Sequence, residues 1–393
     1  MGKAILLVLD GLGIGAMKDS KEVKPEDINA HTLNHIRQHY PLHIPVLDKL
    51  GLAGLVEGRK EFKEAACGKA NLAHAGADTY MGHQEIAGSF PKAPAKRLMK
   101  DIHSALGNQI KEAGYKVEYP WNNKPLLLIN EAVVIGDNLE SAVGNIINMT
   151  ADLNKMPFQD VKKLAETVRE FVDTSRVIAF GNARKATLDD ILGAVREGKA
   201  GQWGVDSPKS GVYGEGYEVF HLGYGVNIYG QFPMIAARAG LPVYRIGKTA
   251  DVLHGEGPAY PIVKTADVLK KLEEEYMKET GDAAYLVNVQ ETDLAGHKED
   301  VNWYGEILEE VDRFLEGFIP SLENNDILII MADHGNDPTI GHSNHTREQV
   351  PIIVTGKQVI PGYLGERETM ADVGATLSSY FSLKPTEKGT SFL

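Results

Sequence analysis

The chain has 393 residues and a formal net charge of -13, and 43% of its residues are hydrophobic. This length allows a large core and one accessory domain, and the acidic charge, with no lysine- or arginine-rich block to offset it, argues against nucleic acid as a partner. A single cysteine, Cys67, excludes an intramolecular disulfide and is consistent with a reducing compartment.

The first apolar run covers residues 4–9 and is interrupted at once by Asp10. It is too short to be a signal peptide or a membrane span. We therefore expect a cytoplasmic protein that has no membrane partner, and the sequence gives no indication of a protein partner.

Short apolar runs bounded by turn residues alternate along the chain with segments of helical periodicity. This alternation predicts an α/β fold with a mostly parallel sheet between helical layers. The predicted strands cover residues 4–9, 285–289, 327–331 and 352–354, and the predicted helices cover residues 161–172, 265–279, 301–318 and 370–379.

The middle of the chain differs in character from both ends. It includes a helical pattern at residues 141–150, and the glycine-rich stretch before Val219 has the composition of a linker. We predict a smaller inserted α+β domain at residues 98–216. The discontinuous metal-binding catalytic core would then consist of residues 1–97 and 217–393.

Asp10 stands where the first predicted strand ends, directly before GLGIG. A dinucleotide-binding loop would require the spacing GxGxxG, whereas this segment has GxGxG and is followed by a poor helix start. On its own, Asp10 could equally be a turn former or a helix cap.

Two further predicted strands end in metal-competent side chains. Asp293 and His297 follow residues 285–289 with the spacing that places both on one face of a helical turn. The strand at 327–331 leads into a segment that reads DHGNDPTIGHSNHTR. Carboxylates and imidazoles at the same edge of a parallel sheet form a ligand set for divalent cations. The candidate ligands are Asp10, Asp293, His297, Asp333, His334 and His345, with His342 as the alternative to His345.

Thr79 lies in the segment ADTYMGHQEIAG. A threonine hydroxyl is a weak nucleophile unless a base or a bound cation activates it, and the cation site predicted above would supply that activation. The alternatives are a capping threonine or a plain turn residue. His83, in the same segment, would either contact a phosphate or fix the loop.

The motifs LLVLDG, DTxxGH, DLAGH, DHGNDPT and NHTRE together resemble the alkaline phosphatase superfamily, and within it the phosphopentomutases. The DLAGH spacing and the DG after the first strand also resemble cofactor-independent phosphoglycerate mutases. The resemblance implies an isomerase that interconverts (deoxy)ribose 1-phosphate and (deoxy)ribose 5-phosphate through a phosphothreonine at Thr79. A sugar bisphosphate is a candidate activator.

The resemblance also assigns the ligands to two divalent cations, with manganese expected. Asp10, Asp333 and His334 would hold one ion beside Thr79, and Asp293, His297 and His345 would hold the other. The inserted domain would close over a small-molecule sugar phosphate. The candidate substrate-binding residues are Lys248, Arg176, Arg184, Lys185, Glu140 and His83.

Three other functions remain open at this point. The same ligand set would serve a phosphatase or phosphodiesterase, because metal ligands alone do not separate hydrolysis from transfer. It would also serve a mutase that acts on a different sugar phosphate, or a sugar-phosphate binding protein without catalysis.

Overall fold

The computed structural model describes residues 2–393. The chain divides into two compact units, each described here by itself. The core unit contains the residues up to Pro91 together with Asn227–Leu393, and the inserted unit is Lys92–Val226. Both units combine strands and helices, as the predicted fold class requires.

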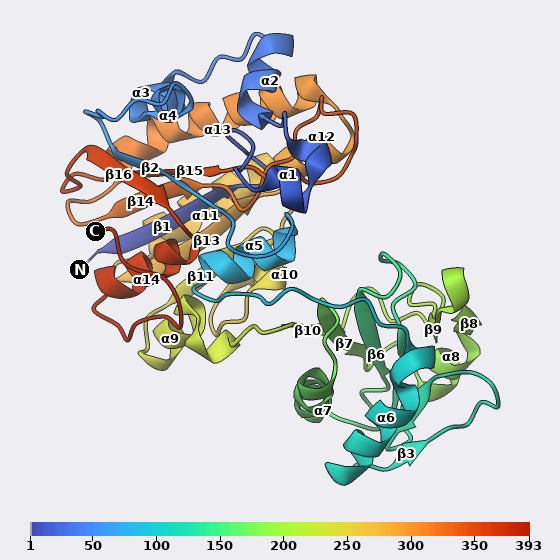
Figure 1. The fold of residues 1–393 in the computed structure, drawn as a ribbon. Helices are drawn as coiled ribbons and strands as arrows, with labels where there is room; N and C mark the ends of the chain where they lie inside the picture. The colour runs from blue at the N-terminus through green and yellow to red at the C-terminus, as the bar shows by residue number, and fades with distance from the viewer. Residues whose placement is uncertain (1) are drawn as a thin grey trace. The chain divides into compact units, whose positions relative to one another are not determined.

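The core unit contains one large sheet (Figure 1). Within residues 2–393 this sheet has eight strands in the order β12-β11-β13-β1-β14-β15-β2-β16, and β15 is antiparallel to both of its neighbours while the other described pairs are parallel. The mostly parallel α/β sheet predicted from the sequence is thus confirmed. The strands are β1 (Lys3–Leu9), β2 (Ala66–Ala70), β11 (Val243–Ile246), β12 (Ala259–Tyr260), β13 (Ala283–Val289), β14 (Ile327–Met331), β15 (Val350–Thr355) and β16 (Gly362–Arg367).

Helices cover both faces of this sheet (Figure 1). One layer contains α2 (Thr32–His39), α3 (Pro45–Leu50), α11 (Thr265–Lys278) and α13 (Val301–Ser321). The other contains α5 (Thr79–Ile86), α9 (Phe232–Arg238), α10 (Thr249–Val252) and α14 (Ala371–Tyr380). The shorter elements are α1 (Ser20–Val23), η1 (Pro25–Asp27), α4 (Leu52–Val56), η3 (Ile228–Gly230) and α12 (Glu291–His297).

The long helix α13 illustrates how the sequence pattern produces this layering. Leu308, Val311, Leu315 and Phe318 recur at intervals of three or four residues and are all buried. That spacing gives the helix an apolar stripe, which packs on the core. The side chain of Asp300 caps the helix by accepting a hydrogen bond from the Trp303 N–H at 3.0 Å.

The inserted unit is built around a second sheet, of different character. Of its described strands, in the order β10-β7-β6-β5-β4-β3, the pair β6–β7 is parallel and the remaining pairs are antiparallel. The elements are β3 (Val117–Glu118), β4 (Leu127–Ile129), β5 (Val133–Asp137), β6 (Ile146–Ala151), β7 (Arg176–Asn182), β10 (Tyr217–Gly223), the hairpin of β8 (Val195–Glu197) and β9 (Trp203–Val205), and the helices α6 (Met99–Glu112), α7 (Phe158–Phe171), α8 (Leu188–Gly193) and η2 (Lys199–Gly201).

Two details of the inserted unit differ from the sequence-based expectation. The helical prediction at residues 141–150 is wrong, because Ile146–Ala151 forms the buried strand β6. Its β-branched residues favour an extended backbone between two neighbouring strands. The glycine-rich stretch before Val219 is not the exit linker, because β10 (Tyr217–Gly223) continues the sheet by pairing with β7.

The boundaries of the inserted unit also lie outside the expected range of 98–216. The backbone N–H of Lys92 donates to the carbonyl oxygen of Tyr224 at 3.0 Å, so the segments that enter and leave the unit are fastened to each other.

No helix in the part of the chain that the structure describes is long and apolar enough to cross a membrane.

Candidate active site

Three neighbouring parallel strands of the core sheet, β13, β1 and β14, end at the same edge. Asp10 follows β1, and Asp333 and His334 follow β14. Asp293 lies in α12, the short helix that begins two residues after β13. Because parallel strands direct their carboxyl ends to one side, residues far apart in the sequence meet here.

The first ligand group consists of Asp10, Asp333 and His334, which are buried and whose ligand atoms lie within 4.8 Å of one another. His334 Nε2 is 3.4 Å from Asp10 Oδ1 and 3.2 Å from Asp333 Oδ2. His334 Nδ1 donates to the carbonyl oxygen of Gly335 at 2.9 Å. In its neutral form, with the proton on Nδ1, His334 would direct the Nε2 lone pair toward the two carboxylates, an arrangement that fits a bound cation.

The absence of a conventional partner for this nitrogen strengthens that fit. His334 Nε2 is buried and, although Asp333 Oδ2 lies 3.2 Å away, it makes no well-aligned hydrogen bond with the described residues. A buried polar atom left unpaired is costly, and a ligand role accounts for it.

The second ligand group consists of Asp293, His297 and His345, also within 4.8 Å. Both imidazoles donate their Nδ1 protons to backbone carbonyls, His297 to Ser343 at 2.6 Å and His345 to Ala77 at 2.9 Å. Their Nε2 atoms lie 3.0 Å apart, and both are within 3.5 Å of Asp293 Oδ1. Two lone pairs that converge beside a carboxylate again fit a cation ligand set.

His342 and His345 are alternative candidates for the same ligand role, and their positions in the structure distinguish them. The structure brings His345 into the second group and places His342 against Asp27, with His342 Nε2 3.0 Å from Asp27 Oδ1.

Burial and neighbouring charges shift the pKa values of these groups in opposite directions. Burial, reinforced by the charge of Asp333, raises the pKa of Asp10 to about 6. Burial would also raise the pKa of Asp333, but the charges and hydrogen bonds of His334 and His83 together outweigh burial and hold that pKa well below its usual range. Burial would lower the pKa of His334, whereas the Asp333 carboxylate raises it to about 10. A cation that binds this group must therefore compete with a proton.

Thr79 lies beside the first group, at the start of α5. The preceding residue, Asp78, caps the helix by accepting a hydrogen bond from the Met81 N–H at 3.0 Å. Thr79 Oγ1 donates to Asp333 Oδ2 at 2.6 Å and is 3.2 Å from Asp10 Oδ1. The hydroxyl is thus directed at the candidate ligands, and the helix N-terminus behind it favours negative charge.

Lys248 links the two groups. Its Nζ lies 2.6 Å from Asp10 Oδ2, 3.2 Å from Asp293 Oδ2 and 3.3 Å from Thr79 Oγ1. Burial would lower the pKa of Lys248, but the carboxylates of Asp10 and Asp293 outweigh it and raise that pKa, so the side chain is an ammonium ion.

His83 is buried beneath Thr79 and not exposed to a ligand. His83 Nδ1 is 2.9 Å from the Thr79 carbonyl oxygen and 3.1 Å from Asp333 Oδ2, and Nε2 is 3.0 Å from Asn288 Oδ1. Both ring nitrogens are therefore engaged within the site, which favours the fixing role over contact with a phosphate.

The remaining predicted substrate residues lie in the inserted unit, and Arg176 is separated there from the other three. Glu140 Oε2 accepts a hydrogen bond from the Tyr213 hydroxyl at 2.9 Å, and Arg184 pairs with Glu215 in the same segment. Lys185 approaches Gly214 there. Arg176 begins β7, whose seven residues place it roughly 20 Å from the end that Arg184 follows.

Two asparagines that the sequence analysis did not select hold the carboxylates in place. Asn288 Nδ2 donates to Asp10 Oδ2 at 2.8 Å, and Asn336 Nδ2 donates to Asp293 Oδ1 at 2.8 Å. A polar residue within the apolar run AAYLVNV could have indicated Asn288. Such partners orient ligands and are part of the site.

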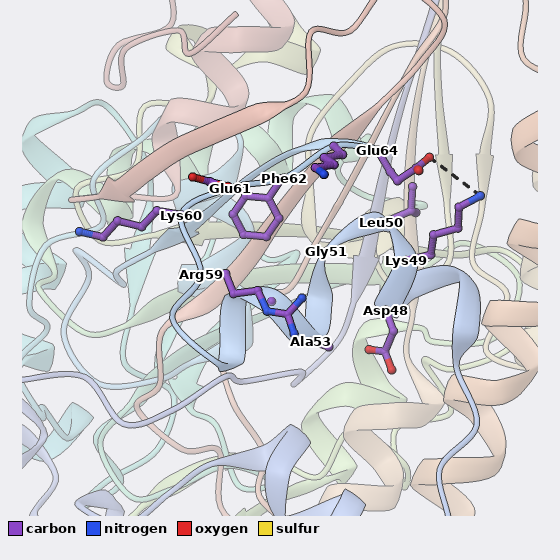
Figure 2. A pocket seen from close by; sticks show the side chains of 12 residues that line it. Asp48, Lys49, Leu50, Gly51, Ala53, Arg59, Lys60, Glu61, Phe62 and Glu64 are labelled. Atoms are coloured by element: carbon purple, nitrogen blue, oxygen red, sulfur yellow. Dashed lines mark ion pairs between the residues drawn. The ribbon is translucent and has the colours of Figure 1, made fainter.

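The core unit also has a cavity of about 720 Å³ whose lining comes from residues 48–64 (Figure 2). Phe62 lies among charged side chains, and the Lys49 Nζ to Glu64 Oε2 distance is 3.9 Å. None of its lining residues belongs to either ligand group, so this cavity is separate from the candidate site.

Close packing of α5 on the end of β14 sets the distance between Thr79 and Asp333, and Gly82 makes it possible. A Cβ atom at Gly82 would lie 2.7 Å from the Asp333 carbonyl oxygen. We expect Gly82→Ala to destabilise the fold by about 1–3 kcal/mol and to lower activity, because the helix must move away from Asp333. Denaturant unfolding and steady-state rates would measure both effects.

The matched control is Gly317→Ala in α13, where an added Cβ meets nothing within 4 Å. This exposed helical site should gain about 0.5–1 kcal/mol with no change in rate. Equal behaviour of the two variants would refute the close-packing argument.

A family model described as the metalloenzyme superfamily matches residues 2–385, and the protein is a member of that superfamily. The chain is 30% identical over 429 residues to the phosphopentomutase of Desulfitobacterium hafniense (strain DSM 10664 / DCB-2), covering 100% of this chain and 99% of the relative. It is 28% identical over 413 residues to the phosphopentomutase of Thermotoga maritima, covering 99% and 98%. The chain belongs to the phosphopentomutase family and is therefore an isomerase.

Among solved structures, a phosphoglycerate mutase of Leishmania mexicana resembles this chain with 13% identity and a TM-score of 0.47, covering 100% of this chain and 97% of that one. The superfamily and the two ligand groups together indicate dependence on divalent metal.

Proposed function

We propose that this protein interconverts ribose 1-phosphate and ribose 5-phosphate, and the corresponding deoxyribose phosphates, through a phosphorylated Thr79. The observation that carries the proposal is the position of the Thr79 hydroxyl, 2.6 Å from Asp333 Oδ2 and 3.2 Å from Asp10 Oδ1. Relatives named phosphopentomutase that match along their full length support the same reaction.

In the proposed cycle, phospho-Thr79 meets the free hydroxyl of a sugar monophosphate. The bond between Thr79 Oγ1 and phosphorus breaks as the sugar oxygen bonds to phosphorus, and the proton that the sugar hydroxyl loses restores the neutral Thr79 hydroxyl. The resulting bisphosphate then returns its other phosphoryl group to Thr79, which leaves the phosphate at a new position. A sugar bisphosphate would supply the first phosphoryl group to an unmodified enzyme and so act as an activator.

The residues around Thr79 fit this transfer. Lys248 Nζ, 3.3 Å from Thr79 Oγ1, would place a positive charge beside the phosphoryl group. The N-terminus of α5 would favour the same negative charge. His83 would hold the Thr79 backbone in place through the carbonyl contact described above.

We further propose that Asp10, Asp333 and His334 hold one divalent cation and that Asp293, His297 and His345 hold a second. The mixed carboxylate and imidazole set suits manganese among other ions. When bound, the two cations would stabilise the charge of the transferring phosphoryl group and lower the pKa of the Thr79 hydroxyl.

The inserted unit, Lys92–Val226, would act as a cap that keeps water from the phosphothreonine. Water and the sugar hydroxyl compete for the same phosphorus, so a mutase needs such closure where a phosphatase does not. Glu140, Arg176, Arg184 and Lys185 are the proposed sugar-phosphate contacts of the cap. Arg184 would first have to leave its ion pair with Glu215.

The test is phosphorus NMR of the purified protein with manganese, a trace of glucose 1,6-bisphosphate and ribose 1-phosphate. We expect the ribose 5-phosphate signal to grow without free phosphate. Growth of free phosphate alone would identify a phosphatase instead, and an unchanged spectrum would direct the search to other sugar phosphates. We also propose that the protein acts in the cytoplasm, in nucleoside metabolism.

A further inference from the structure

The segment at residues 71–78 connects β2 to Thr79 and has no regular secondary structure of its own. It is nevertheless partly interior: Leu72 and His74 are each 1% exposed. Buried backbone groups that no helix or strand satisfies need partners from elsewhere in the fold. We call this segment the nucleophile loop.

Two backbone donors of the nucleophile loop are met by the helix that follows it. Glu85, on α5, accepts hydrogen bonds from the backbone N–H groups of Ala73 and His74 at 3.0 and 2.9 Å. The same carboxylate accepts from Thr369 Oγ1 at 2.6 Å. Glu85 thus fastens the loop to the helix that begins at Thr79.

Three carbonyl acceptors of the loop are met by one side chain, Arg347, which is 4% exposed. Its Nη1 donates to the carbonyl oxygens of His74 at 2.9 Å and Gly76 at 2.5 Å, and its Nη2 donates to that of Leu72 at 3.1 Å. The guanidinium is itself held by Asp19, through Nε at 2.9 Å and Nη2 at 2.7 Å. Only arginine has a planar guanidinium group with enough N–H donors to make all of these hydrogen bonds.

Arg347 also lies two residues after His345, whose Nδ1 donates to the Ala77 carbonyl oxygen at 2.9 Å. One short stretch of chain therefore carries a candidate metal ligand and the clamp on the nucleophile loop. The position of the nucleophile loop relative to the ligand groups therefore determines the distances from Thr79 Oγ1 to Asp10 Oδ1 and Asp333 Oδ2.

We propose that Arg347 is a positioning residue for the phosphoryl transfer: by clamping residues 71–78 it fixes the Thr79 hydroxyl relative to the ligand groups. This inference rests on the proposed function, in which Thr79 is the nucleophile. Misplacement of a reacting atom by about 1 Å can reduce a rate about 100-fold, so a loosened loop should affect turnover far more than substrate affinity.

The experiment compares Arg347→Lys with Arg367→Lys, each as the full-length metal-loaded enzyme. Lysine keeps the charge at 347 but cannot reach three carbonyls and Asp19 together. Arg367 is the control, because its side chain contacts Asp372, through Nε at 2.6 Å, and the Thr390 carbonyl rather than residues 71–78. Its backbone carbonyl accepts from the Asn71 N–H at 2.9 Å, a bond that the substitution to lysine keeps. Measured for each are kcat, KM, metal per chain, melting temperature and hydrogen exchange of residues 71–78.

For Arg347→Lys we expect faster exchange in residues 71–78 and a kcat lower by about 10- to 100-fold, with KM and metal content unchanged. Arg367→Lys should leave the exchange of that segment and kcat unchanged. If Arg347→Lys does not fold, Asp19→Asn weakens the same clamp from its exposed end and should give smaller changes in the same direction.

Unchanged exchange in residues 71–78 would overturn the clamp, and faster exchange at full kcat would overturn its role in positioning Thr79. A loss of kcat that only follows a loss of metal would place the effect at His345 and also overturn the proposal. Absence of isomerisation in the unmodified enzyme would instead refute the proposed function. Hydrogen exchange of residues 71–78 would then be the test of whether Arg347 holds this segment in place.

Discussion

Thr79→Ala should abolish isomerisation, with kcat lower by at least about 10⁴-fold, because the proposed phosphoryl acceptor is removed. The same change should eliminate phosphate from the peptide that contains Asp78 and His83 in mass spectrometry. Thr79 Oγ1 donates a hydrogen bond to Asp333 Oδ2 and lies 3.3 Å from Lys248 Nζ, so the substitution removes the hydroxyl that faces the first ligand group.

Thr79→Ser is the matched control for that result. Serine keeps the hydroxyl at the start of α5 and should retain measurable turnover and a phosphorylated peptide. Circular dichroism and metal content should match the unmodified enzyme in both variants, since Thr79 is outside both ligand groups. Full activity in Thr79→Ala would exclude covalent catalysis at this residue.

Asp10, Asp333 and His334 could be selected from the sequence because they come at the abrupt end of an apolar run, and Asp293, His297 and His345 because they lie in polar segments that continue from such runs. Asp10 and Asp333 are adjacent in space for the reason the sequence pattern suggested, since β1 and β14 are parallel neighbours. A strand that is buried on both faces appears in the sequence as a continuous apolar run. The first polar residue after that run then marks the end of the strand to within a residue.

What the sequence did not indicate depends on contacts between distant segments. Arg347 is one of several charged residues in its loop, and only the fold brings it to carbonyls some 270 residues earlier in the chain. Strand β6 was mistaken for a helix because an isolated short apolar run fits either periodicity. The far limit of the inserted unit differs from the expectation because the glycine-rich stretch before Val219 resembles a linker in composition, whereas β10 still pairs with β7 inside the unit.

His345→Ala should remove one of two cations per chain and lower kcat by at least about 100-fold, because the second group loses a ligand whose lone pair faces Asp293. Metal analysis after gel filtration, with kcat measured at rising manganese concentration, would measure both effects. The melting temperature should also fall, since the bond from His345 to the Ala77 carbonyl is lost.

His342→Ala is the control in the same loop, three residues away. His342 is bonded to Asp27 rather than to either ligand group, so this variant should keep two cations per chain and its full rate at saturating manganese. The reverse outcome, metal loss in His342→Ala and retention in His345→Ala, would mean that the loop rearranges on metal binding and that His342 is the ligand. Because the two variants remove the same side chain from one loop, their difference in metal content reports coordination. Their difference in rate also includes the lost bond from His345 to the Ala77 carbonyl, which His342 does not make.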